Sequence, residues 1–401
     1  MNIRTVTGFI NLADPISDSD VRALHTLLDA ARADFFSAGF PVQTTRMATQ
    51  SLAQIAPRNL PRFAQELESI CRANQIDYVS MGALPGDHPL IEYLAEALAS
   101  TESVFGAAHV ASHADGINLK AITAAARVVC QLANSTTDGF GNLRFAALAN
   151  CPPHSPFFPV AYHDGGTRAF AIATEAASLA ADVFSRAQNL SQARENLVGA
   201  IERAGETLTR TANDLAARFD FRFAGIDFSL APFPEHSASR SIGAAMEKLT
   251  GAKFGEHGTL FAAAFLTDCL NRASFPRTGF SGLMLPVLED ATLAARSSSY
   301  TLDSLLLYST VCGTGLDTIP LSGDTTSDTV AAILLDLATL AVKLNKPLTA
   351  RLMPIPGMKA GDVTRFNFEY FANAHVMDAS ATALKIFETD DRVEFKSIGR
   401  G

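Results

Sequence analysis

Segments with strand-like and helix-like patterns alternate along this chain, and no other feature limits its fold as strongly. Strand-like segments lie at residues 3–10, 76–80, 103–110 and 143–148. Helix-like segments lie between them, at residues 17–38, 60–73 and 121–133. Strands that alternate with helices form βαβ units, in which neighbouring strands run parallel. We therefore expect an α/β fold built on a largely parallel sheet.

The second half of the chain has longer helical patterns. Apolar residues recur every three or four positions across residues 191–218, which predicts one long helix with a single buried stripe. A strand is expected at 221–230, helices at 238–249, 260–272, 302–311 and 328–344, and a late strand at 348–353. No Ser- or Gly-rich linker divides the sequence. We expect one large α/β domain over residues 1–401, with two halves that meet near residues 151–190 and both contribute to the site.

Composition and charge narrow the functional classes. Hydrophobic residues make up 48% of the chain, which is ample for a large core. The 32 basic residues are scattered among 41 acidic ones and the net charge is -9, so nucleic-acid binding is not expected.

Cysteine usage and hydropathy indicate a compartment. The five cysteines are dispersed and form no CxxC pair, which is typical of reduced thiols in a cytosol. No stretch approaches the roughly 20 apolar residues that span a bilayer, and the N-terminus lacks the apolar core of a signal peptide. We expect a cytoplasmic protein without a membrane partner. Because two-fold dimers are the commonest assemblies of soluble proteins, a homodimer is the expected oligomer.

A polar pair at the end of a strand is the clearest candidate site. Asp227 and Ser229 lie on one face of the apolar segment 221–230, and prolines follow at positions 232 and 234. Ligands of α/β sheets bind at the carboxyl ends of strands, so these side chains are suited to a site. The alternative is structural, with Asp227 capping a turn and Ser229 bonding to backbone. The sequence leaves both interpretations open.

Two glycine-rich turns supply further candidates. His257 lies between Gly255 and Gly258 at the expected start of a helix, where an imidazole can transfer protons and the helix terminus favours anions. Cys312 precedes Gly313, which we expect to end the preceding helix in the left-handed conformation and so to expose the thiol. For each of the two, the alternative is a structural role, as a histidine near a helix start or as a small buried thiol.

Weaker candidates complete the set. His163 stands beside an acid in a Gly-rich loop, which suits acid–base chemistry or a turn equally. Asp317 is either a ligand group or a turn residue, and Glu289 either a site carboxylate or a helix-opening residue. With Asp227 and His257, these side chains are donors of the kind that bind a divalent metal, but their spacing matches no metal motif. The sequence contains no phosphate loop, no GxGxxG after the first strand and no GxSxG, so no nucleotide cofactor is expected.

Several short motifs follow one another in a specific order. They are NIRTVT (2–7), GIN (116–118), DFSLAPFP (227–234), EHGT (256–259), GFSG (279–282), ED (289–290), CGTGLD (312–317), IP (319–320) and DT (324–325). In these motifs the chain resembles the PFL-like family (domain of unknown function 711), over nearly its whole length. The resemblance implies a ten-stranded α/β barrel of the pyruvate formate-lyase-like type, with a site inside the barrel mouth and Cys312 on a central loop.

The chain also departs from that resemblance. Glycyl-radical enzymes with this barrel need a glycine in a C-terminal Arg-Val-x-Gly-aromatic motif, whereas this chain ends in SIGRG and has no Cys-Cys pair. Radical chemistry is therefore not expected. His109, His113, Lys120 and the segment 151–163 differ from the family's usual residues, so we expect a specialised substrate to be set there.

Together these features favour a non-radical enzyme that acts on a small polar or anionic metabolite, with lyase, isomerase and hydrolase chemistry all open. In this hypothesis His257 is the general acid or base, and Asp227 orients it or binds a metal. Cys312 is a nucleophile or a second acid–base group.

The other predicted residues bind substrate. They are Asn118, His163, Ser229, Asp317 and Arg351, and the planar fork of Arg351 is suited to clamping a carboxylate. The alternative function is a ligand-binding regulatory or scaffold protein that kept the barrel and lost the chemistry. Its motivation is the missing radical loop together with the absence of any complete catalytic motif.

Overall fold

The computed structural model describes residues 1–234, 238–389 and 391–395. Its strands are β1 (Asn2–Ile10), β2 (Val42–Thr49), β3 (Tyr78–Pro85), β4 (Val104–Ser112), β5 (Gly116–Asn118), β6 (Phe145–Ala149), β7 (Ala169–Glu175), β8 (Arg222–Asp227), β9 (Gly315–Ser322), β10 (Leu348–Ile355) and β11 (Arg392–Val393). They form one mixed sheet in the order β8-β7-β1-β2-β3-β4-β6-β10-β9, to which β5 and β11 are attached at β4.

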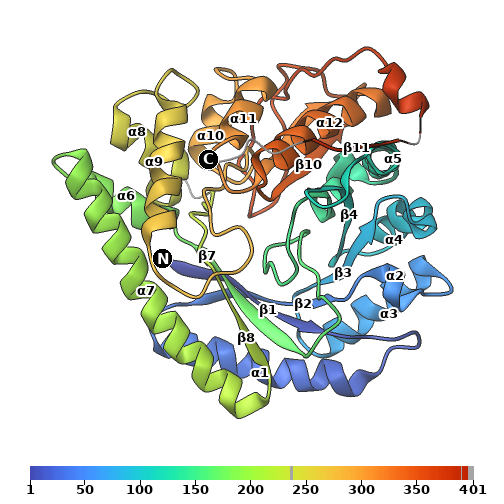
Figure 1. The fold of residues 1–401 in the computed structure, drawn as a ribbon, viewed down its shortest axis with the longest axis horizontal. Coiled ribbons are helices and arrows are strands. Elements are labelled where there is room, and N and C mark those ends of the chain that lie inside the picture. The colour runs from blue at the N-terminus through green and yellow to red at the C-terminus, as the bar shows by residue number, and fades with distance from the viewer. Residues whose placement is uncertain (235–237, 390, 396–401) are drawn as a thin grey trace.

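Helices cover the outer side of this sheet, which curves around a centre occupied by loops (Figure 1). The α-helices are α1 (Asp18–Ser37), α2 (Leu52–Ile55), α3 (Leu60–Ala73), α4 (Leu94–Ala99), α5 (Leu119–Ser135), α6 (Ala177–Arg186), α7 (Leu190–Phe219), α8 (Ile242–Thr250), α9 (Thr259–Arg272), α10 (Ala291–Arg296), α11 (Leu302–Ser309) and α12 (Ser327–Leu344). Short 3₁₀ segments are η1 (Pro89–Tyr93), η2 (Thr137–Arg144), η3 (Ala238–Arg240) and η4 (Lys385–Glu388).

The sheet has a central parallel block and two reversed edges. Strands β1, β2, β3, β4 and β6 run parallel to one another. The parallel pair β7 and β8 joins this block antiparallel at β1, and the parallel pair β9 and β10 joins it antiparallel at β6. At one end of the sheet, the amino ends of the five central strands therefore lie beside the carboxyl ends of β7, β8, β9 and β10.

Within the described part of the chain, isolated bridges connect the edge strands β8 and β9 through a third segment. The segment 276–287 pairs with β8 at Ile226 and beyond it at Leu230, and with β9 at Asp317. Within the described residues no continuous hydrogen-bonded ladder closes the sheet. The structure thus bears out the α/β class and a large central sheet, but not a closed ten-stranded barrel.

Side-chain alternation places two different environments on the two faces of the sheet. On β1, Ile3, Val6 and Ile10 point into the large core beneath the helices, whereas Phe9 belongs to a smaller inner cluster. On β2, Met47 belongs to the outer core. The inner face is therefore free to carry polar residues where the central loops leave space.

Two long loops fill the inner side of the sheet. The segment 151–167 passes beneath the central strands, where Pro156 O accepts from Thr7 Oγ1 and Ala161 O accepts from Ser80 Oγ. The segment 276–284 lies beside it and is joined to it through Thr278, whose Oγ1 donates to the carbonyl of residue 154. These loops form part of the wall of the cavity described below.

The predicted elements agree with the structure where their patterns are long. The helix predicted at 60–73 has those bounds, and the helix predicted at 191–218 extends to Leu190–Phe219. Strands β2, β7 and β9 were not predicted. The strand expected at 221–230 ends at Asp227, because the backbone of the following residues pairs with segment 276–287 instead of continuing the ladder.

Gly313 does not end a helix in the left-handed conformation as predicted. Helix α11 ends earlier, at Ser309, and the left-handed glycine is Gly315, with a φ of 99°. Gly313 is instead a point of close backbone approach, since a Cβ there would lie 2.6 Å from the Cα of Gly282.

No described helix combines the length and the apolar character needed to cross a bilayer. The segment SIGRG at 397–401, which was compared with the radical motif, lies outside the described residues.

Candidate active site

A cavity of about 150 Å³ opens on the inner face of the sheet, at the end where the central strands begin. Strand residues reach it by alternation: Arg4 on β1, Arg46 on β2, Tyr78 on β3, Phe105 on β4 and Arg351 on β10. The rest of its lining is Glu102, Phe140, Leu143, Arg144, Phe157, Phe158, Pro159, Val160, Ala231, Pro232, Phe280, Met284, Pro286, Glu289, Thr314, Asp317, Thr349, Phe368 and Tyr370.

Arg46 is a cation in this cavity without a carboxylate partner. Its guanidinium lies over the rings of Phe158, at 5.0 Å from the centroid, and Tyr78, at 5.5 Å. Its Nε donates to Thr44 Oγ1 at 3.0 Å, and no carboxylate of the described residues lies within 4.0 Å of it. Burial, with a smaller contribution from Arg4, lowers the pKa of Arg46 to about 10. The side chain remains charged at neutral pH, and Glu289, which acts on it electrostatically, lies beyond ion-pair distance.

Arg4 adds a second positive charge beside it. This side chain is buried and donates to the carbonyl of Pro232. Its nearest carboxylate is Glu175, at 3.7 Å, which also forms an ion pair with Arg240. Glu175 is thus near two guanidinium groups, of which that of Arg4 lines the cavity.

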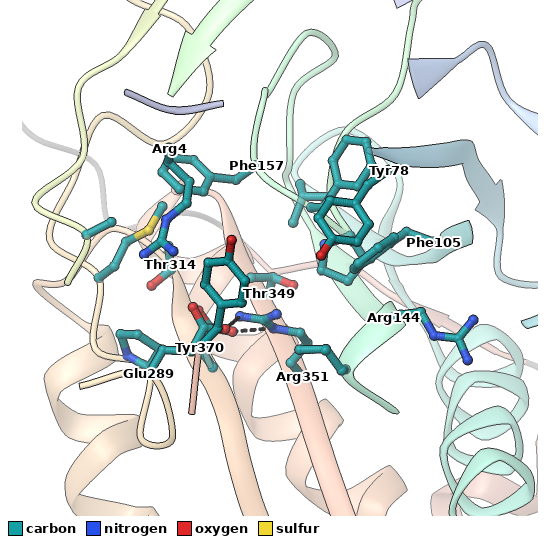
Figure 2. A pocket seen from close by; sticks show the side chains of 18 of the residues that line it. Arg4, Tyr78, Phe105, Arg144, Phe157, Glu289, Thr314, Thr349, Arg351 and Tyr370 are labelled. Carbon is teal, nitrogen blue, oxygen red and sulfur yellow. Dashed lines mark hydrogen bonds and ion pairs between the residues drawn. The ribbon is translucent and has the colours of Figure 1, made fainter. Parts of the chain in front are cut away.

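Arg351, in contrast, is fully paired. Its Nε donates to Asp317 at 2.6 Å and one of its terminal nitrogens to Glu289 at 2.6 Å (Figure 2). Burial alone would lower the pKa of Arg351, but the two carboxylates outweigh it and raise that pKa. The structure thus brings together Arg351, Asp317 and Glu289, all singled out from the sequence. The planar fork predicted to clamp a substrate carboxylate already holds two carboxylates of the protein.

Neutral donors complete the polar lining. The hydroxyls of Tyr78 and Tyr370 make no hydrogen bond to any described residue, and burial raises the pKa of both phenols. Thr314 is 2% exposed, and its Oγ1 has no hydrogen-bond partner among the described residues. These hydroxyls are therefore protonated at neutral pH, and none of them has a hydrogen-bond partner among the described residues.

Aromatic side chains make up most of the remaining wall. Phe105 and Phe158 meet edge to face, with centroids 5.2 Å apart, and Phe140 and Phe368 meet at the same distance. Figure 2 shows Tyr78 and Phe105 on one side of the space and Arg4, Thr314 and Glu289 on the other. An apolar wall with a few convergent polar groups is typical of a site for a small molecule.

Asp227 and Ser229 lie next to this cavity but outside its lining. Both are completely buried, and Ser229 Oγ donates to Asp227 at 2.5 Å. The carboxylate also accepts from the backbone N–H groups of Phe280 and Ser281, at 2.7 Å each. Burial raises the pKa of Asp227 to about 6, although these hydrogen bonds oppose the rise. The pair fixes the turn that presents Phe280 to the cavity.

Three other predicted residues also lie outside the lining. His257 is exposed in the turn before α9. Cys312 is buried two residues before Thr314, and its Sγ accepts from the N–H of Gly315 at 3.3 Å. Asn118 caps α5, because its Oδ1 accepts from the third residue of that helix. The structure does not bring these side chains together, and their proposed roles stay predictions.

His163 belongs to a different cluster, near the carboxyl ends of β1 and β2. One donor atom each from His154, His163 and Asp164 lies within 4.8 Å of the others, a spacing that could hold a metal ion. Both ring nitrogens of His163 already face partners, namely Asn11 Oδ1 and Thr167 O. His154 lies 3.4 Å from a nitrogen of Arg222 and 3.5 Å from Asp164. Burial lowers the pKa of His154 to about 4 and also lowers that of His163, so both rings are neutral at pH 7.

The candidates drawn from the sequence do not include Arg4 and Arg46, although the chain contains a signal for Arg4. Arg4 is a charged residue inside a predicted apolar strand, and such a residue needs a reason to be buried. Arg46 could not be found in this way, because its strand was itself not predicted. Of the positions where the sequence departs from the family it resembles, Phe157–Val160 line the cavity, whereas His109, His113 and Lys120 do not.

Comparison with known proteins gives a family for this architecture. The family model described as "Uncharacterised ACR (DUF711)" matches residues 1–370. A UPF0210 protein from Pyrobaculum arsenaticum is 37% identical over 314 residues, which cover 76% of this chain and 68% of the relative. UPF0210 proteins from Pelotomaculum thermopropionicum and Halothermothrix orenii are 30% and 28% identical over 91% and 100% of this chain, and 88% and 93% of their own. The chain therefore belongs to the DUF711 family.

Proposed function

We propose that this protein is an enzyme that binds a small anionic metabolite in the arginine-lined cavity and transforms it by acid–base chemistry, without a radical. The observation that carries the proposal is Arg46, a cation facing the cavity without a carboxylate partner among the described residues. Removing an ion from water costs several kcal/mol, in order-of-magnitude terms, unless a counter-charge compensates it. A carboxylate or phosphate of a ligand would supply that counter-charge, and Arg4 would reinforce it.

Glu289 is the acid–base group of this proposal. Its carboxylate lines the cavity and is held by Arg351 at 2.6 Å, so its orientation is fixed before any substrate arrives. The protonated phenols of Tyr78 and Tyr370 face the same space and would donate to a developing negative charge. Lyase and isomerase chemistry both need a base and a donor placed in this manner, and hydrolase chemistry stays open.

A second candidate function is ligand binding without turnover. It is favoured by the composition of the lining, in which the described residues include no histidine, cysteine or lysine. A regulatory or scaffold protein would need the arginines and the aromatic wall, but not a mobile proton. The two functions share the anionic ligand and differ only in whether it is converted.

We also infer that the fold is an open variant of the pyruvate formate-lyase-like barrel. The parallel five-stranded block and the reversed strand pairs on either side of it support this inference, as do the isolated bridges from segment 276–287 to β8 and β9. In such a barrel the cavity would lie inside one mouth, between the two central loops.

The experiment replaces Arg46 by Met, which keeps an unbranched side chain and removes the guanidinium with its charge. Small carboxylates and inorganic phosphate are titrated into the full chain by calorimetry. Arg46→Met should weaken binding of the anions at least tenfold, because a charge-assisted hydrogen bond is lost. Arg62→Met, in which an exposed arginine on α3 is replaced, is the matched control and should bind like the wild type. Anion binding that survives in Arg46→Met would contradict the proposal.

Turnover is then followed by NMR of the bound anion over hours. Glu289→Gln keeps an oxygen for Arg351 and removes the base. If Glu289 acts in catalysis, this variant should bind the anion normally, and its turnover rate should be lower by at least about 100-fold. Binding by the wild-type protein with no conversion of any anion that it binds would exclude the enzyme and leave the second candidate function.

A further inference from the structure

The hydroxyl of Thr314 is an unpaired polar group in the wall of the cavity. The residue is 2% exposed, and its Oγ1 finds no hydrogen-bond partner in the described part of the chain. A buried hydroxyl without a partner is destabilising, and nearly all such groups in folded proteins are satisfied by protein, water or ligand. The backbone of Thr314 is held by the sheet, since its carbonyl accepts from Thr349 N at 2.7 Å, whereas its hydroxyl is not.

Thr314 lies on the same side of the cavity as Arg4 (Figure 2). The space is small: a protein cavity of about 150 Å³ accommodates one benzene molecule, and this cavity has the same volume. A ligand of this size has its functional groups only a few bonds apart. A group that reaches Thr314 is therefore close to the anionic group that Arg4 and Arg46 attract.

The charged residues near Thr314 determine which kind of ligand group can bind to its hydroxyl. An ammonium beside the anionic group would face the two arginines, while the carboxylates of Glu289 and Asp317 are both engaged by Arg351. A neutral oxygen avoids this repulsion and can bond to a threonine hydroxyl, which donates and accepts. The remaining walls are apolar, with Phe105, Phe158 and neighbouring rings around the space.

We propose that the ligand is a small α-hydroxy or α-oxo carboxylate with an apolar body, and that Thr314 is the residue that distinguishes it from a plain carboxylate. This inference rests on the proposed function, because it takes Arg46 as the anchor of the carboxylate. Thr314 acts by binding the neutral oxygen and takes no part in proton transfer.

The test uses matched carboxylates that differ only at the α-carbon. Mandelate, phenylglyoxylate, phenylglycine and phenylacetate are titrated into the full chain by calorimetry, with lactate, pyruvate, alanine and propionate as smaller counterparts. In at least one of the two series, the wild type should bind the hydroxy or oxo acid on the order of tenfold more tightly than the unsubstituted acid. The amino acid should bind no better than the unsubstituted acid. Preference for the hydroxy or the oxo acid then identifies the subclass.

Two substitutions connect this preference to Thr314. Thr314→Val replaces the hydroxyl by a methyl group of similar size, so it should erase the preference and leave the affinity for the unsubstituted acid unchanged. It should also raise the melting temperature, because the unpaired hydroxyl is gone. Thr314→Ser keeps the hydroxyl and should retain most of the preference, which separates a lost hydrogen bond from a disturbed wall.

The outcomes separate this inference from the function on which it rests. If the unsubstituted acids bind and Arg46→Met weakens them, but the α-oxygen adds nothing or its advantage survives in Thr314→Val, the inference is wrong and the proposed function stands. If none of these acids binds but inorganic phosphate does, and Arg46→Met weakens it, the inference is likewise wrong and the proposed function stands. If neither the acids nor phosphate bind, or if Arg46→Met leaves their binding unchanged, both are wrong.

Discussion

Arg46 and Arg351 show how differently one protein can treat two cations that line the same cavity. Arg351 is held by Asp317 and Glu289 at 2.6 Å each, and its pKa is raised. Arg46 has aromatic rings and one hydroxyl for neighbours, and its pKa is lowered to about 10. The first arrangement is complete within the protein, whereas the second needs an anion from outside. At this scale the partners of a charge identify a binding residue better than its burial does.

Asp227 gives a pH prediction at the same scale. Its pKa is about 6 in the folded protein, against an ordinary value of 3.8, so the folded state binds the proton more tightly than the unfolded chain. The contribution of this carboxyl to the unfolding free energy is therefore largest below about pH 4 and falls as the pH rises to about 6. The loss is at most about 3 kcal/mol, at roughly 1.4 kcal/mol per pKa unit.

Denaturant unfolding of the wild type and of Asp227→Asn between pH 4 and 7 measures this contribution. Asn lacks the titrating proton, so the difference in unfolding free energy between the two proteins should shrink by that amount across the interval. A difference that is independent of pH would mean that Asp227 titrates at its ordinary value. The variant should be less stable throughout, because an amide N–H₂ would face a backbone N–H of Phe280 or Ser281.

At the scale of elements, two helices share one carboxylate. Asp290 caps α10 by accepting from the N–H groups of Thr292 and Leu293, and it also accepts from Ile242 N and Gly243 N at the start of α8. The side chain is completely buried. One residue thus satisfies the free N–H groups of two helix termini and joins the elements that contain them.

Asp290→Ala should therefore cost more than the loss of an ordinary cap. We expect the unfolding free energy to fall by about 3–4 kcal/mol, since several buried N–H groups lose their acceptor together. Asn59→Ala is the control, because Asn59 caps α3 alone, is exposed, and should cost about 1 kcal/mol. Chemical denaturation of both variants gives the two values. Equal losses would show that the shared cap adds nothing.

The elements that sequence patterns predicted well are those that face only one environment. Helix α3 was predicted with its bounds because its apolar residues form a regular stripe. Strand β2 was not predicted, because Thr44 and Arg46 interrupt its apolar pattern where it meets the cavity. Strand β7 was missed for a different reason: it is rich in alanine, a residue of low strand propensity. The polar residues that β2 contributes near the cavity thus hide its strand pattern in the sequence.

The candidate site was predictable in part. Asp317 was chosen because it follows a Gly-rich turn and Arg351 because its planar fork lies on a late strand, and the structure places both in the cavity. Tyr370 and Phe368 come from the irregular segment after β10, where no periodic pattern indicates a neighbour. Which distant residues meet at one point depends on the strand order, and the sequence pattern does not contain that order.

At the scale of the whole molecule, the site is positive inside a protein of net charge -9. At low salt the overall charge repels an approaching anion over long distances, while the buried contacts in the cavity are screened little. The association rate constant of a carboxylate should therefore rise about two- to threefold between roughly 10 and 150 mM salt. The dissociation rate constant should change little.

Stopped-flow or NMR line-shape measurements at several salt concentrations test this prediction. The neutral amide of the same ligand is the control, and its association rate should not depend on salt. An association rate that falls as salt is added would show that local attraction by the arginines extends into solution and outweighs the net charge.

The cavity joins parts of the chain that are almost as far apart in sequence as the described residues allow. Arg4 lies in β1 and Tyr370 follows β10, yet both line the same cavity of about 150 Å³. A chain that is still being synthesised therefore has no complete binding site until Tyr370 has left the ribosome. The ligand can select only the finished fold, and in a cell its concentration would favour complete molecules over truncated ones.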